Sequence, residues 1–351
     1  MTSSPPRAAC RQVCRMTQAA ISDDTILSVR SLSVGFGRGA SAVTALRDVS
    51  FSLARGRTLA LVGESGSGKS VTSLALMGLL PPSGRIRSGE LLFRERAGRV
   101  IDLARLDAPG FRGLRGPGIS MIFQEPMSSL NPLFTIGDQI GEMLLLHEDL
   151  SATARHKRVI EMLELVEIPG AAARVDAYPH QLSGGMRQRV MIAMGLICHP
   201  ALLIADEPTT ALDVTIQAQI LDLMRRLQKD LGMSILFITH DMGVVAEMAD
   251  DVAVMYAGAV VEQAGVLALF DDTRHPYTQG LLSSIPRAGL GPDNRLVPIA
   301  GTVPSLAVLP PGCTFAPRCP HSQPACRQPV RLEEKAPGHR SACIFDMAGV
   351  A

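Results

Sequence analysis

Short apolar runs alternate with longer segments of helical periodicity along most of the chain. Four runs are apolar and short enough to be buried strands: residues 58–62, 119–123, 201–205 and 234–239. Residues 252–263, with Gly258 at their middle, are typical of a β-hairpin. Strands that alternate with helices predict an α/β layer around a central sheet.

The helical segments have clear boundaries. Residues 70–80 follow the first buried strand and stop before Pro81 and Pro82. Residues 137–146 and 154–166 repeat apolar positions at i, i+3 and i+4, and residues 186–198 form a further predicted helix. Residues 213–231 end at Gly232, which we interpret as a C-cap. These helices predict a helical insert at about 126–195 within the α/β layer.

The remaining segments have a different character. Residues 26–34 and 49–53 alternate apolar and polar positions, as half-buried strands do, and residues 89–93 resemble another strand. Residues 105–118 contain several Gly and Arg and are predicted to be a loop. Residues 1–22 lack periodicity, which predicts a disordered leader, and Met16 is an alternative start. Beyond Arg274 the chain becomes rich in Pro and Gly, which predicts a separate appendage.

Composition excludes several classes of protein. The chain has 351 residues, 46% of them hydrophobic and 19% charged, as in a well-packed globular protein. A formal net charge of +1 gives no broad attraction for nucleic acid. No apolar run approaches the roughly 20 residues needed to span a bilayer, and the leader has no apolar core of a secretory signal. We therefore expect a soluble, cytoplasmic protein.

The most specific motif is a glycine-rich loop between the first buried strand and its helix. It fits G-x-x-x-x-G-K-[ST] without a mismatch, over Gly63, Glu64, Ser65, Gly66, Ser67, Gly68, Lys69 and Ser70. Its glycines allow the backbone to approach a polyphosphate closely, and the helix N-terminus attracts negative charge. Lys69 adds a positive charge on the outer phosphates, and the Ser70 hydroxyl is a suitable ligand for Mg²⁺. The motif predicts a nucleoside triphosphate site.

Polar residues follow three other predicted strands. Asp206 and Glu207 close the strand at 201–205, His240 follows 234–239, and Gln124 follows 119–123. Ligands of open α/β sheets bind at this edge. Asp206 can orient the Mg²⁺ hydration shell, and Glu207 can polarise an attacking water. His240 could hydrogen-bond the γ-phosphate, although a His after an apolar strand is by itself more often a core or turn residue. Gln124 could touch metal and water, although taken alone it would mean little.

A second anion-binding helix start lies at Ser183, Gly184 and Gly185. One fold cannot easily aim two such helix starts at one phosphate group. We therefore predict a head-to-tail dimer, in which this helix start faces the nucleotide of the other subunit. Asp213, at the end of the Ala-Leu-Asp triplet 211–213, is expected at the same seam. An ordinary Ser N-cap is the alternative for Ser183.

Together these motifs resemble the nucleotide-binding subunit of ATP-binding-cassette (ABC) transporters over about residues 26–275. In that family they are the Walker A (63–70), Q-loop (Gln124), signature (182–188), Walker B (202–207), D-loop (211–213) and switch histidine (His240). Met186 departs from the commonest signature, as is familiar in the peptide-importer branch, and no catalytic position is degenerate. The resemblance implies ATP hydrolysis with Mg²⁺, an adenine-stacking role for Phe36, and a nucleotide contact at Val71.

The same resemblance implies the architecture and the partners. The fold is an α/β P-loop NTPase core with a mixed sheet and flanking helices, an antiparallel β subdomain, the helical insert and a Cys/Pro-rich C-terminal extension. We expect a leader at 1–22, a cassette at 23–274 and the extension at 275–351. Expected partners are a second ATPase subunit, two membrane permeases docked near the loop at 127–132, and indirectly an extracytoplasmic binding protein. The implied location is the cytoplasmic face of the inner membrane.

The extension contains four of the seven cysteines, at Cys313, Cys319, Cys326 and Cys343. In a reducing compartment such a group is typical of metal ligands. The sequence around them resembles the tail of oligopeptide/dipeptide and nickel importer ATPases, some of which carry a [4Fe-4S] cluster there. A [4Fe-4S] cluster, zinc and unliganded thiols stay open as alternatives. Cys198 is expected in the core, and Cys10 and Cys14 are expected to have no role.

Several functions are compatible with these motifs. The first is the ATPase subunit of an importer of di- or oligopeptides, with a nickel importer as its alternative. The second is a soluble ABC ATPase without a membrane partner, but such proteins usually fuse two cassettes or insert a long coiled coil. The third is a small-molecule kinase, which would have no use for the second anion site. We expect the first.

Overall fold

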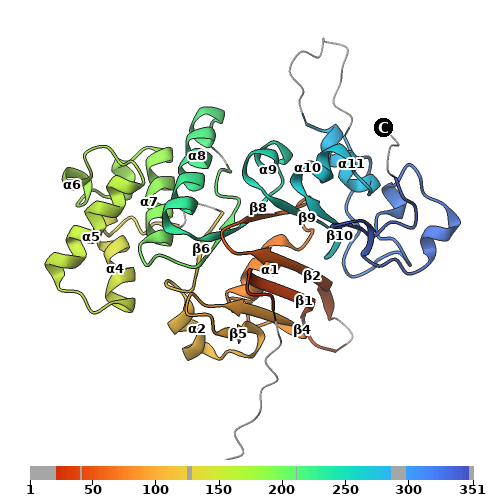
Figure 1. The fold of residues 1–351 in the computed structure, drawn as a ribbon, viewed down its shortest axis with the longest axis horizontal. Helices are drawn as coiled ribbons and strands as arrows, with labels where there is room; N and C mark the ends of the chain where they lie inside the picture. Colours follow the sequence, from red (N-terminus) through yellow and green to blue (C-terminus); the bar gives the residue numbers. More distant parts are fainter. Residues whose placement is uncertain (1–20, 40–41, 125–128, 211, 286–297, 348–351) are drawn as a thin grey trace, which may run out of the picture.

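A computed structural model of the chain describes residues 21–39, 42–124, 129–210, 212–285 and 298–347 (Figure 1). The predicted leader, with Met16, Cys10 and Cys14, falls almost entirely outside the described residues. So do Ala211 and the first part of the loop at 127–132.

An eight-stranded mixed sheet forms the centre of the molecule, in the order β11-β12-β10-β9-β3-β8-β7-β6. Its strands are β3 (Thr58–Val62), β6 (Ile119–Ile122), β7 (Leu202–Asp206), β8 (Ser234–Thr239), β9 (Asp251–Tyr256), β10 (Ala259–Gly265), β11 (Glu333–Ala336) and β12 (His339–Ser341). The strands from β9 to β6 pair in parallel, whereas β10, β12 and β11 pair in antiparallel fashion. The predicted hairpin is β9–β10.

The parallel strands bring four chain segments to one edge of the sheet. β3 ends before Gly63, β6 before Gln124, β7 before Glu207 and β8 before His240. Because parallel strands share the direction of their carboxyl ends, all four segments must meet at this edge.

Side chains alternate across the central strands and face two separate cores. Leu203, Ala205, Ile235 and Phe237 face the helices of the insert and α8 (Val214–Leu231). Their neighbours in the strands (Leu202, Ile204, Leu236 and Ile238) face α1 (Lys69–Leu76) and the strands of a smaller sheet. Strands buried on both faces read as continuous apolar runs, which is why these strands are clear in the sequence.

The smaller sheet is antiparallel and has the order β2-β1-β4-β5. It consists of β1 (Thr25–Phe36), β2 (Val43–Ala54), β4 (Gly84–Arg94) and β5 (Val100–Asp102). β1, β2 and β4 are longer than the strands expected at 26–34, 49–53 and 89–93, and β5 was not expected. In Figure 1 it lies beside α1, on the opposite side of the central sheet from α8 and α9 (Met242–Met248).

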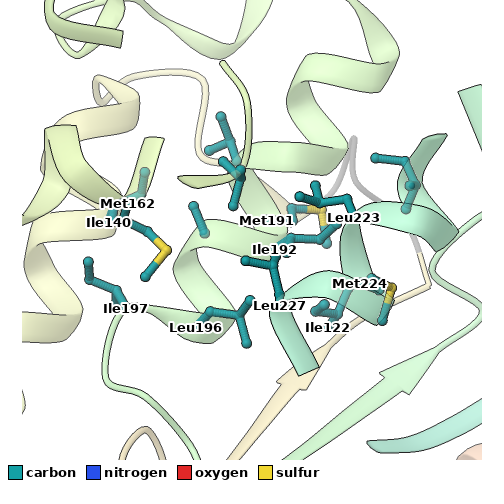
Figure 2. Close-up of a cluster of buried hydrophobic side chains, with 14 of the residues drawn as sticks. Ile122, Ile140, Met162, Met191, Ile192, Leu196, Ile197, Leu223, Met224 and Leu227 are labelled. Atoms are coloured by element: carbon teal, nitrogen blue, oxygen red, sulfur yellow. The ribbon is translucent and has the colours of Figure 1, made fainter. Parts of the chain in front are cut away.

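The helical insert forms one end of the molecule (Figure 1). It contains α4 (Ile136–His147), α5 (Ala152–Leu165), α6 (Ala171–Arg174), a 3₁₀ turn (Pro179–Gln181) and α7 (Gly184–Leu196). Side-chain N-caps begin the main helices, at Thr135, Ser151 and Ser183. Figure 2 shows the apolar core around Ile192, with Ile140 and Met162 on one side of it and Leu223 of α8 on the other. Cys198 is buried in the same core, as expected.

One local prediction is wrong. Residues 105–118 are not a loop throughout, because Ala108–Leu114 forms the helix α2, preceded by a 3₁₀ turn at Leu103–Arg105. Asp107 caps α2 by accepting a hydrogen bond from the Gly110 backbone N–H at 2.9 Å. The buried side chains of Phe111 and Leu114 attach it to the core. Packing outweighs the low helix propensity of the two glycines here.

The C-terminal extension is less separate than its composition predicts. Beyond α10 (Val266–Asp271) and α11 (Pro276–Ser283), it contains 3₁₀ turns at Ala316–Arg318 and Pro324–Arg327, and then β11 and β12. β12 pairs with β10, and the Ala342 backbone N–H donates to the Val261 carbonyl at 2.7 Å. Phe315 packs in one core with Tyr256 and Tyr277. In Figure 1 the extension lies at the opposite end from the insert.

Among the described residues, no helix has the length and apolar character needed to cross a bilayer.

Candidate functional site

The glycine loop leads from β3 to α1, as predicted, and requires glycine at two positions. A Cβ atom at Gly63 would lie 2.2 Å from the Met255 carbonyl oxygen. Gly68 has φ +105°, and its Cβ would lie 2.6 Å from the Leu46 side chain. These close approaches bring the loop backbone against β9 and β2, and they leave Ser65 and Gly66 on the exposed side.

Lys69 is buried beneath this loop. Its Nζ donates to the carbonyl oxygens of Gly63 at 2.6 Å and Glu64 at 3.1 Å. Burial lowers the pKa of Lys69, and the nearby charges of Glu207, Asp206 and Glu64 oppose that shift. The ammonium group therefore lies inside the loop where a phosphate would approach. There it could exchange its hydrogen bonds to the two carbonyls for hydrogen bonds to phosphate.

Asp206 is the most buried acid of the site. Its Oδ2 accepts from the Ser73 hydroxyl at 3.3 Å, and Ser70 is a further hydrogen-bond partner. Burial raises the pKa of Asp206, while these two hydroxyls lower it. The other oxygen, Oδ1, is buried without a hydrogen-bond partner in the described part of the chain. An unsatisfied buried carboxylate oxygen beside a serine hydroxyl fits a hard cation such as Mg²⁺.

Glu207 connects three elements. Its Oε2 accepts from Gln124 Nε2 at 3.1 Å and from the Thr210 hydroxyl at 3.0 Å. Its Oε1 lies 3.2 Å from His240 Nδ1. Glu207 also has φ +47°, which is uncommon for a non-glycine residue, and its backbone N–H donates to the Ile238 carbonyl at 2.9 Å. A strained backbone that is held by β8 fixes the direction of this carboxylate.

The structure thus brings Gln124, Glu207 and His240 together at the carboxyl edge of the sheet, with Asp206 adjacent in the chain. We call these four residues the strand-end cluster. Two partners in this site were missed in the sequence, namely Thr210 and Ser73. Thr210 follows Glu207 by three residues, and Ser73 follows Ser70 by one helical turn. Such spacings predict contact only once the loop conformation and the helix are known.

The second anion-binding helix start lies elsewhere. Ser183 caps α7 by accepting from the Met186 backbone N–H at 3.3 Å, and Gly185 packs against Ile216 at the start of α8. Asp213 caps α8 and accepts from the Ile216 backbone N–H at 2.9 Å. Figure 1 shows α7 among α4, α5 and α8, away from α1. Ser183 and Asp213 therefore belong to one surface, which is separate from this chain's own phosphate loop.

Two further sets of predicted residues lie outside the strand-end cluster. Phe36 ends β1, is half-buried and packs against Gly84. Val71 is half-buried in the first turn of α1. The four C-terminal cysteines line one small pocket in the extension, together with His275 and His321.

The comparisons agree with this geometry. The family model described as "ABC transporter" matches residues 46–210, and the model described as "Oligopeptide/dipeptide transporter, C-terminal region" matches 261–326. The chain is 54% identical over 304 residues to the dipeptide transport ATP-binding protein DppD of Bacillus subtilis, covering 86% of this chain and 89% of that protein. It is 54% identical over 292 residues to the oligopeptide transport ATP-binding protein OppD of the same organism, covering 83% and 80%.

A solved structure supports the same relationship. The dimeric, post-hydrolysis ATP-binding cassette MJ0796 bound to ADP and Pi matches with a TM-score of 0.60 and 26% identity, over 69% of this chain and 99% of that chain. With two family models, long relatives and a cassette structure in agreement, this chain belongs to the ABC transporter family of ATPases, in the group with an oligopeptide/dipeptide transporter C-terminal region.

Proposed function

We propose that this chain is the ATP-hydrolysing subunit of a membrane importer of dipeptides or oligopeptides. The observation that carries the proposal is the match of residues 261–326 to the oligopeptide/dipeptide C-terminal region, on a chain whose strand-end cluster keeps every predicted catalytic group. Two relatives that are 54% identical to this chain over the aligned residues are named as dipeptide and oligopeptide transport proteins.

The chain's own residues divide the chemistry among themselves. The loop from Gly63 to Ser70, with Val71, binds the phosphates through backbone N–H groups and Lys69, and Phe36 stacks on the adenine. Ser70, Asp206 and Gln124 would hold Mg²⁺, which would neutralise phosphate charge. Glu207 polarises the attacking water, and His240 orients the water and the γ-phosphate. The hydrogen bond that Gln124 donates to Glu207 helps to fix the direction of the carboxylate.

The surface with Ser183, Gly184, Gly185 and Asp213 completes the nucleotide site of a second ATPase subunit, which we propose to be a different polypeptide. Two observations support the presence of a second subunit at this surface: α7 lies away from this chain's own loop, and the cassette matched above is dimeric. ATP binding closes such a dimer, and hydrolysis with product release reopens it.

The motion would reach two membrane permeases through a groove beside Gln124. Apolar side chains from β6 and the residue after it, and from the helical insert, line this groove, among them Met121, Phe123, Met143 and Met194. Phe123 is exposed, as a docking side chain would be. This role locates the chain at the cytoplasmic face of the inner membrane, with an extracytoplasmic binding protein as an indirect partner.

Uptake measurements test the proposed function. In cells from which the gene for this chain is deleted, we expect uptake of a radiolabelled dipeptide to be lost and to return with the parent gene. The same gene carrying Lys69→Ala should not restore it. Nickel uptake measured in parallel is the control. Loss of nickel uptake with unchanged dipeptide uptake would contradict the peptide assignment.

We further propose that Cys313, Cys319, Cys326 and Cys343 hold a [4Fe-4S] cluster. All four line one pocket, and none of the described cysteines forms a disulfide. Burial raises the pKa of Cys313, Cys319 and Cys343. As they stand, no three His, Cys, Asp or Glu side chains in the described ranges are arranged as a metal-ligand group.

Iron and acid-labile sulfide assays test this site. Protein purified without oxygen should contain about four iron and four sulfide per chain for a [4Fe-4S] cluster. The Cys319→Ser variant should lose most of both, whereas Cys198→Ser, which alters a cysteine of the core, should keep them. Zinc without sulfide, or a colourless protein free of metal, would overturn the proposal.

A further inference from the structure

The phosphate loop is attached to the C-terminal extension through its second residue. Both carboxylate oxygens of Glu64 accept hydrogen bonds from Arg318, at 2.6 Å from Nη1 and 3.0 Å from Nη2. The Glu64 backbone N–H donates to the Tyr277 hydroxyl at 2.9 Å. The Glu64 carbonyl accepts from Lys69. Glu64 is therefore held on one side by the phosphate-binding lysine and on two sides by residues of the extension.

Arg318 is itself firmly positioned. Its side chain is only 5% exposed, and Nε donates to the Ala300 carbonyl at 2.8 Å. Its guanidinium lies 5.8 Å from the centre of the Tyr256 ring. Tyr256, Tyr277 and Phe315 pack against one another, with ring centres 4.6 to 5.3 Å apart. A planar, two-point pair on such a rigid base fixes both the distance and the angle of its partner.

The position of Glu64 matters because it sets the loop that receives the phosphates. The residues that follow it, Ser65 and Gly66, are exposed. If the loop were free to move, binding of nucleotide would also have to order its backbone, and affinity would fall. The pair also neutralises a carboxylate that would otherwise repel phosphate from the edge of the site.

We propose that Arg318 is a positioning residue for the nucleotide site, through which the C-terminal extension holds the phosphate loop in its binding conformation. The inference rests on the nucleotide site proposed above. The extension then has a role in ATP binding within its own chain. Arg318 ends the turn Ala316–Arg318, which lies between Cys313 and Cys319, so the fold of the cysteine segment determines where its guanidinium sits.

Binding of a fluorescent ATP analogue to the full chain tests the proposal. We expect Arg318→Met to raise the Kd about tenfold, equivalent to about 1.4 kcal/mol. Arg318→Lys, which keeps the charge but loses the two-point geometry, should raise it less. The double variant Arg318→Met with Glu64→Gln should bind no more weakly than the weaker single variant, because both changes break the same pair. Arg331→Met, which alters an exposed arginine of the extension, is the matched control.

Steady-state hydrolysis separates positioning from a general loss of structure. The KM for ATP should rise about tenfold in Arg318→Met while kcat stays within about twofold, because bound nucleotide orders the loop. An unchanged Kd and KM, or a fall in kcat that follows the loss of folded protein by circular dichroism, would overturn the proposal. Lys69→Ala separates failure of the Arg318 role from failure of the proposed nucleotide site. If Lys69→Ala also binds ATP normally, the nucleotide site itself is wrongly assigned.

Discussion

Glu207→Gln is expected to lower ATP hydrolysis at this chain's site by about 10²- to 10⁴-fold, the contribution typical of a general base. ATP affinity should change little, because the Glu207 carboxylate contacts Gln124 and His240 rather than the glycine loop. Glutamine keeps the volume and can still accept the hydrogen bond from Thr210. It loses the negative charge that draws a proton from water. Bound ATP should therefore accumulate unhydrolysed and keep the proposed dimer closed.

The measurement uses radiolabelled ATP bound to the purified transporter complex. Nucleotide recovered from the variant should remain ATP, whereas the parent should yield ADP. Glu247→Gln is a matched control, because Glu247 is an acid on the surface that pairs with Arg225. If Glu207→Gln converts its bound ATP as fast as the parent does, the role of Glu207 is wrong.

Lys69→Ala is expected to weaken ATP binding by roughly 10- to 150-fold. Hydrogen bonds to charged groups contribute about 1.5–3 kcal/mol each, and Lys69 is the buried cation inside the phosphate loop. The variant also removes the hydrogen bonds that Lys69 donates to the Gly63 and Glu64 carbonyls. Both effects act in the same direction.

Titration with a fluorescent ATP analogue measures this loss. Lys157→Ala is the control, because Lys157 is an exposed lysine on α5 that pairs only at the surface with Glu161. Affinity of Lys69→Ala within twofold of the parent would mean that the loop does not bind nucleotide as proposed.

The parts of the site that were predictable are those set by strand direction. Gln124, Glu207 and His240 each follow a buried strand, and parallel pairing brings such positions together without any detail of side-chain packing. The ends of α8 were also clear, because Asp213 and Gly232 are strong cap residues and both act as caps. Local chemistry and topology sufficed for these elements.

Other features depend on tertiary packing and left little trace in the sequence. α2 forms because Phe111 and Leu114 reach the core, against a local composition that favours a loop. The pair of Glu64 and Arg318 joins residues 254 positions apart. Nothing in either segment indicates the other, since the contact exists only after the extension has folded back onto the cassette.

The pairing of β12 with β10 has a consequence for shortened chains. β10 lies within the sheet only because residues 339–341 cover its outer side. A chain cut before residue 330 would leave β10 as an edge strand, with unpaired N–H and C=O groups that can recruit another chain. We would expect such fragments to associate edge to edge, so the tail also protects the cassette from aggregation.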